Sequence, residues 1–122
     1  MNQELKGSLA EASAGLIYIS ETDAEITPFE GGPAGAVAAG DLLGQTGHSA
    51  DAPVEERGFE EIFARLLRSD EDGRFAALKS VMEQNLRDLK VFKVGKIQLD
   101  VYFVGLDAEG NLSGVQTKAV ET

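Results

Sequence analysis

The last quarter of the chain carries the pattern that most constrains the fold. From position 97 to 103 apolar and polar residues alternate, and the apolar members are Ile97, Leu99, Val101 and Phe103. A period of two is typical of a strand with one buried face. Residues 107–111, Asp-Ala-Glu-Gly-Asn, have turn chemistry, and residues 112–120 can return as an antiparallel strand. The chain therefore requires an antiparallel sheet with a layer packed over it.

This β-compatible pattern continues almost to Thr122, although the ends of chains are commonly unstructured. An ordered ending places the Glu121 carboxylate and the Thr122 hydroxyl side by side. Their oxygens can bind a cation, or contact the metal or the basic side chains of another protein. The alternative is that both residues form a solvated tail, and the pattern alone leaves the two readings open.

Helical spacing and breaker residues organise the N-terminal half. The predicted elements are a helix over 2–14, capped by Asn2 and ended by Gly15, and a strand over 16–20. An acidic turn over 21–25 leads to a return strand over 26–30, which Pro28 confines to a sheet edge or a bulge. Residues 31–35 are a breaker cluster, residues 36–43 fit a short helix, and residues 45–53 fit a loop.

Two further helices and a strand complete the predicted order. Apolar residues recur at helical spacing over 59–66 and again over 75–86, with an acidic turn at 69–73 between them, and residues 91–94 fit a short strand. This order predicts an α+β fold in which helices cover one or both faces of an antiparallel sheet. The length of 122 residues fits a single domain over 1–122.

The charge of the chain excludes several classes of partner. Residues 1–56 hold ten acids and one base, so −9 of the net charge of −10 lies in this segment. Such a field repels nucleic acid and anionic membranes, and it attracts basic proteins whose clefts hold phosphate. Plain solubility is the alternative explanation. Without a signal-peptide pattern or an apolar run of about 20 residues, we expect a cytoplasmic protein.

Few residues offer catalytic or metal chemistry. The chain has no cysteine, and its one histidine, His48, stands close to Ser49 and Asp51. Triads assemble in space and not by local adjacency, so this spacing favours a histidine that braces its loop through backbone hydrogen bonds. We therefore predict no enzyme and no cofactor, with a small hydrolase using His48 as a remaining alternative.

Several segments, taken in order, resemble the bacterial nuclease A inhibitors, small acidic proteins that block a sugar-non-specific, metal-dependent DNA/RNA nuclease. The similar segments are residues 12–21, 45–48, 51–53, 99–102, 110–112, 117–118 and 120–122. The resemblance implies an α/β/α sandwich around a mainly antiparallel sheet. It also implies a monomer that binds one nuclease molecule, without direct contact to nucleic acid or membrane.

The resemblance further implies which residues meet the nuclease. An acidic face docks on the basic cleft, Glu21 is an acidic contact, and Thr122 completes a bridge to the metal of the nuclease. To these we add Glu121, because its carboxylate adjoins Thr122. Hard oxygen ligands suit Mg²⁺, so such an inhibitor requires no metal site of its own.

One departure from the family concerns the loop between the two later helices. The family carries an Asp followed by a Trp there, whereas this chain has residues 68–73, Arg-Ser-Asp-Glu-Asp-Gly, without Trp. A buried Trp can contribute a few kcal/mol at an interface, so we expect Asp70, Glu71 and Asp72 to supply electrostatic steering instead. The alternative function is an acidic interaction module of the same fold that binds another basic protein.

Overall fold

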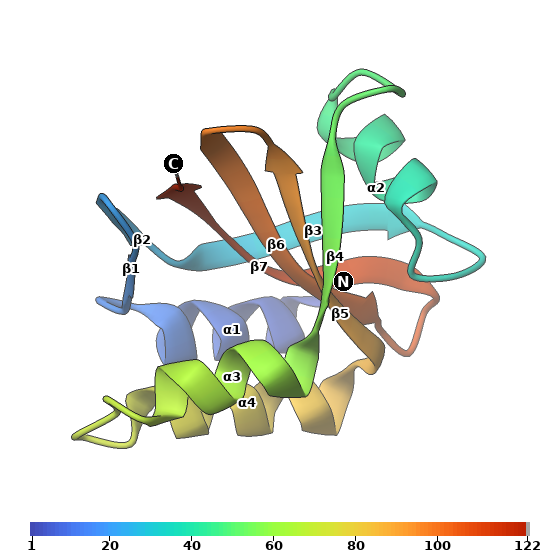
Figure 1. The fold of residues 1–122 in the computed structure, drawn as a ribbon. Helices are drawn as coiled ribbons and strands as arrows, with labels where there is room; N and C mark the ends of the chain where they lie inside the picture. The colour runs from blue at the N-terminus through green and yellow to red at the C-terminus, as the bar shows by residue number, and fades with distance from the viewer. Residues whose placement is uncertain (122) are drawn as a thin grey trace.

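In the computed structural model, which describes residues 1–121, a five-stranded antiparallel sheet lies between two layers of helices (Figure 1). The strands are β3 (Thr27–Pro33), β4 (Val54–Gly58), β5 (Arg87–Gly95), β6 (Gln98–Leu106) and β7 (Asn111–Val120), in the spatial order β3-β7-β6-β5-β4. The helices α1 (Gln3–Ser13), α3 (Phe59–Leu67) and α4 (Arg74–Asn85) cover one face, and α2 (Ala39–Thr46) covers the other. The expected α/β/α sandwich is confirmed.

The alternation along β6 sorts side chains between the two faces of the sheet. Val101 and Phe103 pack beneath α1, α3 and α4, whereas Tyr102 and Val104 pack beneath α2. The helix residues that meet them include Leu9, Phe63, Leu78 and Met82 on the first face, and Leu42 and Leu43 on the second. Each face therefore has its own apolar core, and the sheet is covered on both sides.

The predicted C-terminal hairpin is confirmed. Strands β6 and β7 pair from Gln98↔Val120 to Leu106↔Leu112. The turn between them is organised by Asp107, whose carboxylate accepts hydrogen bonds from the Glu109 and Asn111 amides at 2.9 and 3.0 Å and from the Ser113 hydroxyl at 2.9 Å. These bonds keep a 3 % exposed carboxylate satisfied within the fold.

The predicted first helix is confirmed with its signals. The Asn2 side chain accepts a hydrogen bond from the Leu5 amide at 2.8 Å, as an N-cap residue does. After α1 ends at Ser13, Gly15 adopts a φ of +77°, a conformation that glycine enters without steric cost. None of the helices within residues 1–121 is both long and apolar enough to cross a membrane.

The position of the return strand was predicted wrongly. Strand β1 (Ile17–Ile19) pairs with β2 (Asp23–Glu25), so residues 23–25, predicted as part of an acidic turn, are themselves the return strand. Residues 27–33 instead form β3, which pairs with β7 at the edge of the main sheet. Pro28 therefore lies on an edge strand, as expected. Charged residues are depleted from strands in general, but a solvent-exposed two-stranded hairpin accepts them.

Strand β4 and the exact place of α2 escaped prediction. Residues 54–58, Val-Glu-Glu-Arg-Gly, contain one large apolar residue, yet they pair with β5 along the outer edge of the sheet. Charged side chains on an edge strand discourage pairing with another chain. The short helix predicted over 36–43 begins later, at Ala39, and ends at Thr46.

Candidate functional site

One end of the molecule brings the β1–β2 hairpin and the end of β7 together (Figure 1). The Val120 amide donates to the Ser20 hydroxyl at 3.0 Å, and the Glu21 amide donates to the Val120 carbonyl at 3.2 Å. On the other side, the Glu121 amide donates to the Ile97 carbonyl at 3.0 Å. The last described residues are therefore held between the hairpin turn and the turn that joins β5 to β6.

Glu21 and Glu121, both predicted from the sequence, line one cleft of about 420 Å³, here called the tail cleft. Its basic residues come from three elements: Arg57 from β4, Arg65 from α3 and Lys93 from β5. The carboxylates of a strongly acidic protein thus meet a local group of cations at the end of β7.

Lys93 is the buried member of the tail cleft. Its side chain is 6 % exposed, and its Nζ lies 2.7 Å from Glu121 Oε1. Arg57 forms ion pairs with Glu55 and Glu61 at the rim. The hydrogen bond to Glu55, together with the charges of Glu55, Glu61 and Glu121, raises the pKa of the Arg57 guanidinium above its ordinary value. The Glu121 carboxylate is therefore engaged in an ion pair with Lys93 of the same chain.

The three predicted contact residues of the acidic loop between α3 and α4 differ in their hydrogen bonds and exposure. Asp70 accepts hydrogen bonds from the Phe75 and Ala76 amides, both at 2.9 Å, so its carboxylate holds the first turn of α4. Asp72 accepts a longer bond of 3.3 Å from the Arg74 amide. Glu71 and Asp72 are exposed, whereas Asp70 is half-buried. Their contact with a partner stays a prediction.

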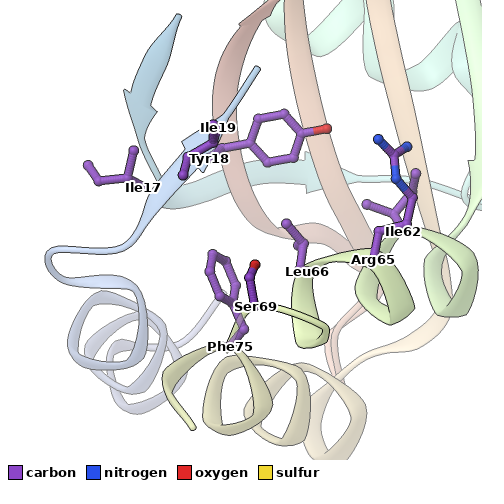
Figure 2. Close-up of a pocket in the computed structure, with 8 residues that line it drawn as sticks. All are labelled: Ile17, Tyr18, Ile19, Ile62, Arg65, Leu66, Ser69 and Phe75. Atoms are coloured by element: carbon purple, nitrogen blue, oxygen red, sulfur yellow. The ribbon is translucent and has the colours of Figure 1, made fainter. Parts of the chain in front are cut away.

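A groove runs from the hairpin to this acidic loop, and we call it the hairpin groove. Figure 2 shows side chains of β1 on one side and side chains of α3, the loop and the start of α4 on the other. Its volume is about 180 Å³, and its lining residues are Ile17, Tyr18, Ile19, Ile62, Arg65, Leu66, Ser69 and Phe75. No sequence pattern indicates this groove, because it depends on contact between segments about 50 residues apart.

The predicted metal bridge through Thr122 cannot be placed, since Thr122 lies outside the described residues. Within residues 1–121, no three or more His, Asp or Glu side chains are grouped as the ligands of a metal ion are. The role of Thr122 therefore stays a prediction.

His48 braces its loop through side chains and not through the backbone contacts that were expected. Its Nε2 lies 3.1 Å from the Tyr102 hydroxyl and 3.2 Å from Asp100 Oδ2. Burial, and then the charge of Asp100, raises the pKa of the Tyr102 hydroxyl. The Ser49 hydroxyl instead donates to Asp51. The three residues considered for a triad therefore form two separate sets of contacts, His48 with Tyr102 and Asp100, and Ser49 with Asp51.

A comparison with protein families gives one match of almost full length. The family model described as "Nuclease A inhibitor-like protein" matches residues 3–122. This match confirms the resemblance found in the sequence. No curated protein matches the chain.

Proposed function

Because the chain belongs to the nuclease A inhibitor-like family, we propose that it inhibits a sugar-non-specific, metal-dependent DNA/RNA nuclease by direct contact. The observation that best supports this is the meeting of Glu21 and Glu121 at the tail cleft, beside Thr122 in the sequence. Carboxylates gathered at one end of an acidic protein suit a nuclease cleft that holds phosphate. In this proposal the inhibitor occupies the site that nucleic acid requires.

Thr122 has the central role in the proposed complex. It follows Glu121 directly, and an oxygen from it would enter the coordination of the Mg²⁺ bound by the nuclease. Backbone hydrogen bonds of Val120 and Glu121, together with the ion pair to Lys93, hold in place the two residues that precede Thr122. A segment that is already ordered loses less conformational entropy when it binds.

The remaining predicted contacts have supporting roles. Glu21 faces the basic cleft of the nuclease, and Asp70, Glu71 and Asp72 steer the approach through their charge. Glu121 contributes charge at the interface while it holds the chain end through Lys93. The proposal also includes a 1:1 complex, a cytoplasmic location, and protection of the producing cell from its own nuclease.

A second candidate is an acidic module of the same fold that binds a different basic protein. The loop at residues 68–73 favours it, because this loop lacks the Trp that the sequence comparison leads us to expect there. The two candidates differ in one measurable property, which is inhibition of nuclease activity.

The direct test is a titration of the protein into a magnesium-dependent, sugar-non-specific nuclease that is degrading DNA. We expect activity to fall linearly to zero at one equivalent of inhibitor. The same titration against an unrelated magnesium-dependent nuclease serves as the control. An unchanged rate at a large excess of the protein over every such nuclease tested would contradict the proposal and favour the second candidate.

A further inference from the structure

Among the described residues, large apolar side chains are exposed only at one end of the folded molecule. Within residues 1–121 they are Ile17, Ile19 and Ile97, with exposed fractions of 37, 75 and 56 %. Ile17 and Ile19 line the hairpin groove, and Ile97 is the residue whose carbonyl accepts the Glu121 amide. An isolated exposed apolar residue such as Ile97 is normal, but Ile17 and Ile19 together, beside the candidate contact surface, indicate an interaction site.

The size of the hairpin groove limits what it can hold. Its volume is about 180 Å³, and a cavity of about 150 Å³ lined by apolar side chains holds one benzene molecule. Leu66 and Phe75 form the side that faces Ile17 and Ile19 (Figure 2). The groove therefore fits a single side chain and is too small for a helix.

The chemistry of the groove favours an aromatic occupant. Tyr18 and Phe75 contribute rings to its walls, and aromatic rings pack well edge to face. Arg65 lines both this groove and the tail cleft, and within residues 1–121 its guanidinium forms no ion pair or hydrogen bond. A guanidinium without a carboxylate partner is available to stack on an aromatic face.

The charge around the groove indicates the surface that carries this occupant. Exposed acids flank it at both ends: Glu21, Asp23 and Glu25 on the hairpin, and Glu71 and Asp72 on the loop. An apolar centre within a charged rim is the arrangement of an interface hot spot. Its complement is an aromatic side chain that projects from a basic surface.

We propose that the hairpin groove receives one aromatic side chain from the rim of the basic cleft of the nuclease. This inference rests on the proposed inhibitory function. The aromatic side chain lies between β1 and α3, with Arg65 against its face, and it fixes the orientation of the acidic hairpin on the nuclease.

Serine substitutions test the groove against a matched control. In the I17S/I19S protein we expect the inhibition constant to rise about tenfold or more, because a central apolar contact is lost. The control is I97S, which removes an isoleucine of comparable exposure outside the groove, and we expect a change of less than about twofold from such a rim position. Retained cross-strand NMR contacts between Tyr18 and Ala24 verify that the hairpin persists. Equal losses in the two proteins, or no loss in either, would overturn the proposal.

A second arm involves no nuclease, so that failure of the groove and failure of the inhibitory function are distinguished. Indole, the side chain of Trp, is titrated to millimolar concentration into the free protein while NMR signals of Leu66 and Phe75 are followed. We expect saturable shifts that are strongly reduced in R65M. Shifts without inhibition of any nuclease would leave the groove as an aromatic site and remove the nuclease as its partner. No shifts in the native protein would overturn the aromatic assignment.

Discussion

Lys93 is the side chain that holds Glu121, the last described residue, in place. It lies in the run Val91–Val94 on a central part of β5, almost fully buried, and its ammonium group pairs with Glu121 across the sheet. An uncompensated ammonium at this depth would be costly, so the Glu121 carboxylate satisfies Lys93 as much as Lys93 holds Glu121. A sequence pattern cannot reveal this pair, because residues 93 and 121 meet only through the pairing of three strands.

The Lys93→Met substitution removes the charge and keeps an unbranched apolar side chain. We expect the inhibition constant to rise by about two- to tenfold, since the chain end must then be ordered on binding. Faster hydrogen exchange at the Glu121 amide should accompany this loss. Lys118→Met, which breaks the exposed pair with Asp100, is the control and should leave both quantities unchanged. Wild-type inhibition and exchange in Lys93→Met would contradict the role of Lys93.

Asp107 gives a prediction on pH. Burial alone would raise the pKa of this carboxyl, but the hydrogen bonds from Asn111, Ser113, Glu109 and the N-terminal ammonium group outweigh burial and lower it below its ordinary value. A lowered pKa in the folded state means that the carboxylate stabilises the fold above about pH 4, the value in the unfolded chain, and that this contribution is lost as the pH falls through the folded value.

The Asp107→Asn substitution should therefore lower the free energy of unfolding by about 1–3 kcal/mol at pH 7 and by clearly less at pH 3. Urea unfolding at the two pH values measures both differences. Glu109→Gln, in the same turn but exposed, is the control and should have little effect at either pH. An equal destabilisation by Asp107→Asn at pH 3 and pH 7 would show that the carboxylate charge is not responsible.

Among the elements, predictability followed the strength of the periodic pattern. Strands β6 and β7 and helices α1, α3 and α4 have clear apolar periods, and each was predicted to within a few residues. Strands β2 and β4 were not, because both are short and charged, and only their pairing with β1 and β5 makes them strands. The hairpin groove lies between predicted elements, but their relative placement depends on packing that no local pattern encodes.

Alanine substitution at two glycines, one on a strand and one on a helix, should change the free energy of unfolding in opposite directions. On β7, a Cβ added at Gly114 would lie 1.9 Å from the Phe103 carbonyl oxygen, whereas at Gly7 on α1 nothing lies within 4 Å. Gly114→Ala should lower the free energy of unfolding by about 2 kcal/mol or more through overpacking. Gly7→Ala should raise it by about 0.5–1 kcal/mol, because alanine favours the helix. Thermal or urea unfolding measures both, and a stabilised Gly114→Ala protein would contradict the close packing of β7.

At the scale of the whole molecule, charge governs the encounter with the partner. Most of the net charge of −10 lies in residues 1–56, which include the acidic hairpin, and the described cations gather partly in the tail cleft. This uneven distribution gives the approaching partner an orientation as well as an attraction. Position in the sequence predicted the asymmetry, but the meeting of Glu21 and Glu121 with the three basic residues of the tail cleft depends on the fold.

The association rate with the nuclease should therefore fall steeply with ionic strength, by about tenfold or more between low salt and 0.5 M, as expected for electrostatic steering. Stopped-flow mixing at several salt concentrations measures the rate. Charge reversal by Glu21→Lys and Asp23→Lys should slow association at low salt, whereas Glu109→Gln should not. A rate that does not depend on salt would contradict steering by the acidic surface.

The central claim is that this end of the molecule closes the active site of a nuclease through Thr122. Deletion of Thr122 tests it most directly, because Glu121, the tail cleft and the rest of the fold remain. Inhibition constants of the native and shortened proteins are measured against the same magnesium-dependent nuclease, with unfolding curves of both as the control. We expect unchanged stability and inhibition weakened by about tenfold or more, the effect of losing a strong interface contact. Equal potency of the two proteins would contradict the claim.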